Sequence, residues 1–184
     1  MPRIFAALMP ASCLALLLAA CASNPILPPQ HTVAHIDLNR YMGRWYVIAN
    51  IPYLLERGKV ASIDEYGVGE DGWMTNNFIF RRGSLDAPEV TWHGKAKVTN
   101  TETNAEWKVQ FIWPFTAPYM VIDLDPDYRW AVVGYPDRSL MWVLSRDTTL
   151  AAPIYQGIVA RAAAQGYDTS KLTMIPQPLQ PALP

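Results

Sequence analysis

The chain has almost no cysteine, with only Cys13 and Cys21 among its 184 residues. It also has no excess of one charge, since 15 Lys and Arg oppose 16 Asp and Glu for a formal net charge of −1. Nucleic-acid-binding proteins usually carry an excess of basic residues, so this balance excludes nucleic-acid binding as a first interpretation. Apolar residues make up 51% of the chain and charged residues 17%. We therefore expect one domain with a sizeable core rather than global disorder.

Long apolar runs are also scarce, and the main one lies at the N-terminus. Residues 4–20 are apolar, but Pro10 and Ser12 interrupt the run and it is short for a membrane span. The run ends Leu18-Ala19-Ala20-Cys21, which resembles the lipobox of bacterial lipoprotein signals. An ordinary signal peptide followed by a chance cysteine is the alternative. The resemblance implies that residues 1–20 are a removed signal and that a lipidated Cys21 anchors the chain to a membrane.

The residues around the expected anchor indicate a destination and a tether. Ala22 rather than Asp follows Cys21, and the resemblance then implies the outer membrane, with the domain facing the periplasm. Cys13 leaves with the signal, so no disulfide is expected even in an oxidising compartment. Residues 21–34 are predicted to be the lipidated cysteine and a Pro-rich tether, and residues 177–184 a disordered tail. The domain itself is expected to span residues 35–176.

Short apolar or alternating runs, separated by turn residues, predict a series of strands followed by one helix. Residues 152–165 predict the helix, because Ile154, Ile158 and Ala162 recur at intervals of four and Gly166 follows the end. Hairpin-spaced strands are typical of an up-and-down barrel or a sandwich, and periodicity does not choose between them. The eight predicted strands are residues 45–51, 60–68, 73–82, 89–98, 106–113, 119–124, 129–135 and 140–146.

Three short motifs follow one another along these strands. Gly43-x-Trp45 opens the first, an Asp-Tyr turn before a buried strand lies in residues 124–134, and Met-Trp-Val-Leu-Ser-Arg occupies residues 141–146. Together they resemble the signatures of the lipocalins, and the likeness covers about residues 31–178. It implies an all-β fold: an eight-stranded antiparallel up-and-down barrel with one C-terminal α-helix packed outside. The Glu56-Arg57-Gly58 loop and Trp113-Pro-Phe115 are similar to the bacterial outer-membrane members in particular.

The same resemblance implies that Gly43, Trp45 and Arg146 hold the fold rather than bind a ligand. Trp45 is expected to plug the closed end of the barrel. The Arg146 guanidinium is expected to pack across its indole, a cation–π contact worth about 0.5–2 kcal/mol.

Ligand contacts are expected instead from apolar side chains that alternate onto the inner wall. Such a wall suits an acyl chain, and the resemblance implies a fatty acid or lysophospholipid that is bound or carried for envelope maintenance. The residues predicted to bind lipid are Trp92, Phe111, Trp113, Tyr119, Val121, Trp130, Trp142 and Leu144. Val132 is also predicted to face inward. An error of one residue in the predicted strand register would place every side chain on the opposite face of the sheet.

Two groups of residues are candidate polar partners for the ligand. By alternation Asp64 and Asp123 point into the barrel, where an ionised carboxylate would disfavour an anionic headgroup. Near the rim, the candidates for a polar headgroup are Arg57, Lys59, Arg81, Arg82 and Tyr119.

Sequence motifs for catalysis and metal binding are absent. No Gly-x-Ser-x-Gly occurs, and a lipidated Cys21 is no nucleophile. His31 and His35 precede the barrel and are expected to be solvated, while His93, next to Trp92, is expected on the outer face. We therefore predict no catalytic residue, no metal and no cofactor. Two alternatives stay open: a lipid- or isoprenoid-modifying enzyme on the same barrel, and a protein-interaction module whose barrel is filled by side chains. A homodimer is open as well.

Overall fold

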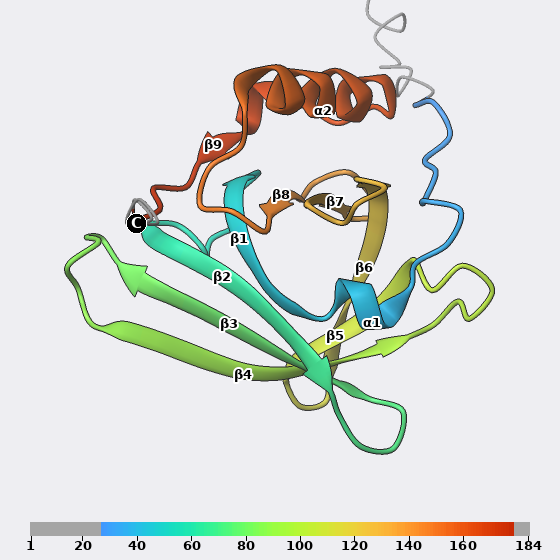
Figure 1. Cartoon of the computed structure of the whole chain (residues 1–184), viewed down its shortest axis with the longest axis horizontal. Helices are drawn as coiled ribbons and strands as arrows, with labels where there is room; N and C mark the ends of the chain where they lie inside the picture. The colour runs from blue at the N-terminus through green and yellow to red at the C-terminus, as the bar shows by residue number, and fades with distance from the viewer. Residues whose placement is uncertain (1–26, 179–184) are drawn as a thin grey trace, which may run out of the picture.

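Eight antiparallel strands form a sheet that closes on itself, because β1 pairs with β8 along one edge and with β2 along the other (Figure 1). The computed structural model describes residues 27–178, so the predicted signal, Cys21 and the end of the tail lie outside the described residues. The predicted barrel is confirmed. Its strands are β1 Gly43–Asn50, β2 Lys59–Val68, β3 Met74–Arg82, β4 Glu89–Val98, β5 Glu106–Ile112, β6 Phe115–Leu124, β7 Trp130–Gly134 and β8 Met141–Ser145.

The main helix, α2 (Ala152–Ala164), lies across the outside of the barrel (Figure 1). Ile158 and Ala162 are its buried residues, as their spacing predicts, and Gly166 ends it with a φ of +87°. The 3-10 helix η2 (Thr169–Lys171) and the two-residue strand β9 (Thr173–Met174), which pairs with β1, follow. No helix within residues 27–178 is long and apolar enough to cross a membrane.

Two hydrophobic cores result, one inside the barrel and one between the barrel and α2. The inner core includes Trp45, Trp107 and Leu144, and the outer core includes Trp130 and Ile158. Helix α2 covers the outer face of β7, and the barrel interior covers its inner face. All five residues of β7 are therefore buried.

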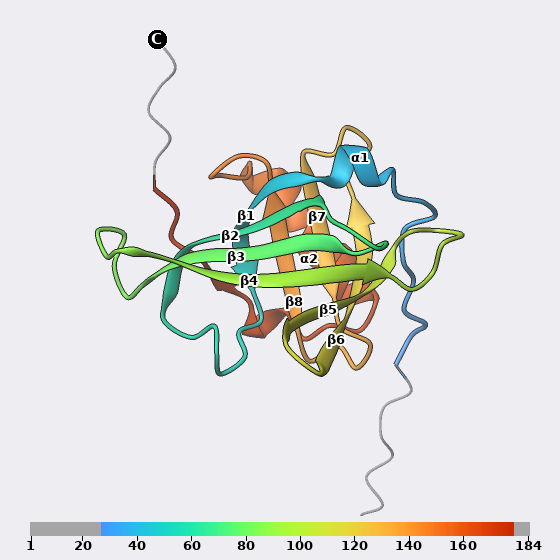
Figure 2. The same cartoon turned by 90° about the horizontal axis from the view of Figure 1, so that it is seen from below.

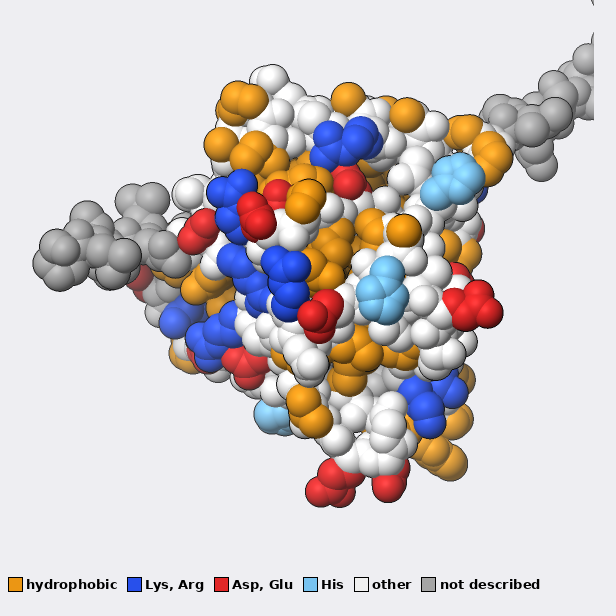
Figure 3. All heavy atoms as spheres, turned by 45° about the vertical axis from the view of Figure 1, so that its right-hand side comes forward, with side chains coloured by type: hydrophobic (Ala, Val, Ile, Leu, Met, Phe, Trp, Pro, Cys, Tyr) orange, Lys and Arg blue, Asp and Glu red, His pale blue; other side chains and the backbone are white. Residues whose placement is uncertain are grey.

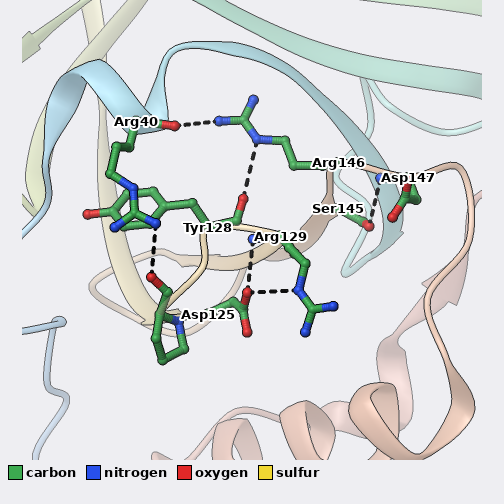
Figure 4. Close-up of polar contacts among 8 residues, drawn as sticks. Arg40, Asp125, Tyr128, Arg129, Ser145, Arg146 and Asp147 are labelled. Carbon is green, nitrogen blue, oxygen red and sulfur yellow. Dashed lines mark hydrogen bonds and ion pairs between the residues drawn. The ribbon is translucent and has the colours of Figure 1, made fainter.

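The closed end of the barrel is built around Trp45, whose side chain is fully buried. The Arg146 guanidinium carbon lies 3.7 Å from the centroid of a Trp45 ring. Arg146 also donates a hydrogen bond to the carbonyl oxygen of Arg40, at 2.7 Å (Figure 4), and another to that of Arg44, at 2.8 Å. These carbonyls lie at the short helix α1 (Leu38–Tyr41) and the start of β1, so one cation ties α1, β1 and β8 together.

The segment before α1 runs along the barrel wall. Val33 donates a backbone hydrogen bond to Val121, and nearer the start Arg138 binds the carbonyl oxygen of Pro28. The part of the expected tether that is described therefore packs against the barrel. Acidic and basic side chains are interspersed on the face shown in Figure 3, which carries this segment, rather than gathered into a patch of one sign.

The two ends of the barrel differ. In Figure 2, α1 and the β4–β5 loop lie at one end, while the β1–β2 and β3–β4 loops lie at the other. The Trp45–Arg146 contact closes the first end. The site described below opens at the second.

Candidate functional site

A cavity of about 330 Å³ occupies the half of the barrel away from Trp45. Residues at the open end, such as Tyr53 and Tyr135, form its entrance. Its size is near the lower limit for ligand pockets, which suits a single acyl chain better than a two-chain lipid. Its lining residues are Tyr53, Glu56, Asp64, Tyr66, Asn76, Phe78, Trp92, Val109, Phe111, Ala117, Pro118, Tyr119, Tyr135, Leu140 and Trp142.

The floor of the cavity is a chain of three tyrosine hydroxyls. Tyr66 donates a hydrogen bond to Tyr119, and Tyr119 and Tyr41 share another, both at 2.9 Å. The Trp107 and Tyr119 rings stack with centroids 4.8 Å apart. Burial raises the pKa of all three tyrosines well above the usual range, so the hydroxyls stay neutral. The lower barrel is therefore filled by side chains, and the space above this floor is open.

Asp64 projects into the cavity from the middle of β2. Burial, and secondarily the negative charge of Glu56, raise the pKa of the Asp64 carboxyl to about 8. At neutral pH most of this carboxyl is protonated, so it can both donate and accept a hydrogen bond. Asp64 accordingly places a neutral polar group on an otherwise apolar wall.

At the entrance, Glu56 ties the β1–β2 loop to the wall. Its carboxylate accepts hydrogen bonds from Trp142 Nε1, at 3.0 Å, and Asn50 Nδ2, at 2.7 Å. Burial raises the pKa of Glu56 to about 7, although these two hydrogen bonds and the charge of Lys59 oppose the shift. The loop conformation thus depends on a carboxyl that titrates close to neutral pH.

A buried ammonium group lies on the same side of the entrance. Lys59 Nζ is 3.3 Å from the centroid of a Trp92 ring and 3.9 Å from that of Phe80. Lys59 is 4% exposed, and its Nζ has no hydrogen-bond partner among the residues that the structure describes. Burial lowers its pKa to about 8 despite the nearby Glu56. Trp92 lines the cavity and Lys59 does not, so the ammonium lies against the cavity wall rather than in its lining.

Six of the eight residues predicted to bind lipid lie inside the barrel. Trp92, Phe111, Tyr119 and Trp142 line the cavity. Val121 and Leu144 belong to the inner core, where neither is exposed at all. Their roles in binding remain predictions, but their inward orientation agrees with the alternation of β4, β5, β6 and β8.

The predicted orientations of Trp130 and Val132 are wrong. Both lie in the outer core beneath α2, while their neighbours Ala131 and Val133 belong to the inner core. Trp130 pairs with Ser145, whereas the inward Leu144 pairs with Ala131, and directly paired residues share a face. Trp130 therefore belongs to the surface against which α2 packs.

Trp113 also lies away from the cavity, at the β5–β6 turn. Its side chain is 81% exposed, and it is absent from the cavity wall. The strand that was expected to carry it inward ends at Ile112, after an irregularity in the β5–β6 register between Val109 and Ile112.

Asp123 points outward, not into the barrel as alternation predicts. A β-bulge between Val121 and Asp123 shifts the register, and Asp123 Oδ2 then lies 2.7 Å from Arg161 Nε on α2. An inserted residue reverses the alternation beyond it, which is the physical reason for the error. The two aspartates thus differ: Asp64 lies in the cavity, and Asp123 holds the helix.

The predicted polar rim is partly corrected. The Tyr119 hydroxyl lies in the floor rather than at the rim. Arg81 donates a hydrogen bond to the Ala87 carbonyl oxygen at 2.5 Å, and Arg82 lies beside Phe80. Arg57 is exposed on the β1–β2 loop. Lys59 is thus the buried cation among these candidates.

Sequence reasoning missed Tyr66, Asn76 and Phe78, which share the wall with Asp64. The Gly69–Gly72 turn predicts that β2 pairs with β3, and counting outward from that turn would have placed these residues on one face. Glu56, Tyr53 and Tyr135 lie on loops, where no periodicity signals their orientation.

His93 lies on the outer face of β4, where the sequence predicts it. His93 is exposed and lies 3.0 Å from Asn77 Oδ1 on the outer face. Within residues 27–178, no three His, Cys, Asp or Glu gather as metal ligands.

Asp64 is expected to make stability depend on pH. Between its ordinary pKa of 3.8 and about 8, the folded state keeps a proton that the unfolded chain has lost, so stability falls as the pH rises through this window. We expect Asp64→Asn to remove this decline. Its advantage over the parent protein should grow by about 2–4 kcal/mol between pH 5 and pH 8, as measured by urea denaturation.

The matched control for that experiment is Asp123→Asn, because Asp123 is paired with Arg161 at the surface. This variant should keep the pH dependence of the parent protein. Parallel stability curves for the parent and Asp64→Asn would contradict the placement of a protonated carboxyl inside the cavity.

Comparison with known proteins agrees with this architecture. A model of the lipocalin-like domain matches residues 36–177. The chain is 37% identical to the outer membrane lipoprotein Blc of Escherichia coli K12 over 93% of this chain and 96% of that one. It is 32% identical to the protein of the same name from Vibrio cholerae, over 79% of this chain and 85% of that one.

Among solved structures, insecticyanin from the tobacco hornworm Manduca sexta shares the fold, with a TM-score of 0.63 at 19% identity over 81% of this chain and 85% of that one. The named relatives place this chain among the outer-membrane lipoproteins. Their family consists in general of binding and carrier proteins rather than enzymes. The barrel is closed at one end, its cavity lies above an aromatic floor, and these similarities agree with both features. The chain belongs to the lipocalin family.

Proposed function

We propose that this lipocalin binds one single-chain lipid, a fatty acid or a lysophospholipid, and stores or carries it for maintenance of the outer membrane. The observation that carries the proposal is the cavity of about 330 Å³ with its walls of Phe78, Trp92 and Trp142. Removing an acyl chain from water into such walls gains about 25 cal/mol per Å² before entropy costs. The tyrosine floor limits how deep the chain reaches.

The headgroup would lie at the entrance, near Lys59. The Lys59 ammonium has no acceptor within the described part of the chain, and a carboxylate or phosphate would supply one. Arg57, exposed on the β1–β2 loop, adds positive charge beside it. Deeper in the barrel the cavity wall is largely apolar, so the tail rather than the head enters first.

We further propose that Cys21 is lipidated and holds the barrel at the periplasmic face of the outer membrane. The described chain begins beside the open end, where Arg138 of the β7–β8 loop binds Pro28. An anchor a few residues earlier would keep the entrance close to the bilayer from which a lipid is taken. Two or more acyl chains on one cysteine make such an anchor stable.

Two tryptophans provide a matched test. Trp142 lines the cavity, and Trp130 lies beneath α2. We expect Trp142→Ala to weaken binding of dodecanoate and of a lysophospholipid about tenfold, since losing about 60 Å² of apolar contact is worth about 1.4 kcal/mol. Isothermal titration calorimetry on detergent-free protein carrying Cys21→Ser measures this change.

Trp130→Ala should behave in the opposite way, with affinity retained and the free energy of unfolding lowered by a few kcal/mol. Affinity that falls with Trp130→Ala but not with Trp142→Ala would argue against ligand binding inside the barrel. It would favour a site on the outer surface.

A further inference from the structure

Two polar side chains without hydrogen-bond partners project into the otherwise apolar cavity. Asn76, on β3, is 3% exposed, and its Oδ1 has no partner within residues 27–178. Asp64, on β2, lines the same cavity, and no described side chain forms a hydrogen bond with it. An unsatisfied buried polar group costs about 1–3 kcal/mol. Asn76 Oδ1 is such a group, and packing of the barrel alone gives no reason to keep it beside the half-buried Asp64 carboxyl.

The register of the β2–β3 pair places the two groups close together. Tyr66 lies opposite Asn76, and Asp64 lies opposite Phe78, so Asp64 and Asn76 are diagonal neighbours on the inner face. Diagonal neighbours have Cβ atoms about 7–8 Å apart or slightly less. No hydrogen bond joins the two side chains, and both line the cavity, so a single polar atom of a ligand beside them can reach both.

We propose that Asp64 and Asn76 form a subsite for a hydroxyl group carried on the buried chain of the ligand. This inference rests on the proposed function and specifies the class of ligand: a single-chain lipid with a hydroxylated tail. A hydroxyl donates one hydrogen bond and accepts others. It would donate a hydrogen bond to Asn76 Oδ1 and accept one from the protonated Asp64 carboxyl.

The protonation of Asp64 supports this assignment. Its raised pKa, about 8, keeps most of the carboxyl neutral near pH 7, so the carboxyl has a proton to donate. A plain methyl-ended chain would displace water from the two groups without replacing its hydrogen bonds, and such a displacement loses affinity. A hydroxylated chain replaces them.

The depth of the subsite gives the position of the hydroxyl. Because β2 bulges between Val60 and Ile63, Lys59 and Asp64 lie opposite Arg82 and Phe78, which are four residues apart on β3. This corresponds to about 13 Å at about 3.3 Å per residue. With the headgroup beside Lys59, the hydroxyl then lies roughly ten to twelve carbons along the chain. A suitable probe is 12-hydroxydodecanoate, with dodecanoate as its methyl-ended counterpart.

The test compares these two ligands and 12-aminododecanoate by isothermal titration calorimetry at pH 7 on detergent-free protein carrying Cys21→Ser. We expect 12-hydroxydodecanoate to bind about tenfold more tightly than dodecanoate. Asp64→Leu and Asn76→Leu should each reverse this preference, whereas Asp64→Asn should keep it. Val109→Ala, an apolar change in the same wall, should weaken both ligands equally.

Each other outcome has a definite meaning. Dodecanoate binding as tightly as 12-hydroxydodecanoate, or more tightly, would overturn the subsite and leave the carrier proposal standing. Tightest binding of 12-aminododecanoate would overturn the hydroxyl assignment in favour of a cation site at the carboxyls. Binding of none of the three would overturn both proposals. If Asp64→Leu fails to fold, the ligand comparison on the parent protein and Asn76→Leu still decide.

Discussion

Replacing Trp45 by alanine is expected to lower the free energy of unfolding by about 3–5 kcal/mol, the usual cost of truncating a fully buried tryptophan. Trp45 is 0% exposed, and its Nε1 donates a hydrogen bond to the Tyr41 carbonyl oxygen at 2.8 Å. Its ring also supports the Arg146 guanidinium and lies 4.9 Å from the Tyr41 ring. The substitution therefore opens a void at the closed end and removes the platform for Arg146. Urea denaturation at pH 7 measures the change.

Trp113→Ala is the matched control for this prediction. The Trp113 side chain is 81% exposed at the β5–β6 turn, and its loss should change the unfolding free energy by no more than about 0.5 kcal/mol. If the two variants were equally stable, the Trp45–Arg146 contact would not be what closes the barrel.

Filling the cavity is expected to have the largest effect on binding. Ala117 lines the entrance from β6 and is itself exposed, so a larger side chain there meets open space rather than packed atoms. We expect Ala117→Trp to weaken dodecanoate binding by about a hundredfold or more, since a tryptophan excludes the ligand from much of the cavity wall. Thermal stability should change little. Isothermal titration calorimetry and a melting curve on the same sample measure both quantities.

Thr116→Trp is the control for that experiment. Thr116 is adjacent to Ala117, is also exposed, and is absent from the cavity wall. This variant should bind dodecanoate as the parent protein does. Loss of binding in both variants would point to a disturbed β5–β6 hairpin, and loss in neither would contradict entry of the ligand through this opening.

The fold could be predicted from the sequence because its signals are local. Turn residues separate the strands, and the intervals between Ile154, Ile158 and Ala162 mark the one long helix. Strand ends agree within about two residues except at β6, which begins at Phe115 rather than residue 119. Pro114 and Pro118 punctuate that segment and obscured its start.

The inner face of β7 could not be read from the sequence. The strand is Trp-Ala-Val-Val-Gly, and all of its residues are buried because α2 covers one face and the barrel interior the other. Alternation identifies a face only where one side is polar. Trp130 therefore looked as suitable for the cavity as Ala131 did.

The cavity could be predicted only in part, for two further reasons. The bulge between Val121 and Asp123 reverses the alternation of β6, and no residue type in that stretch marks it. Glu56 reaches the entrance from a loop, where its orientation follows from hydrogen bonds to Asn50 and Trp142 rather than from periodicity. Residues on regular strands such as Trp92 and Trp142 were placed correctly.

The proposed occupant of the cavity is one single-chain lipid. Native mass spectrometry of detergent-free protein carrying Cys21→Ser, titrated with dodecanoate and with a lysophospholipid, tests it most directly. We expect saturation at one lipid per barrel, with Trp142→Ala weakening the complex and Trp130→Ala leaving it intact. A protein that stays empty across both titrations, or that takes up lipid without saturation, would contradict it.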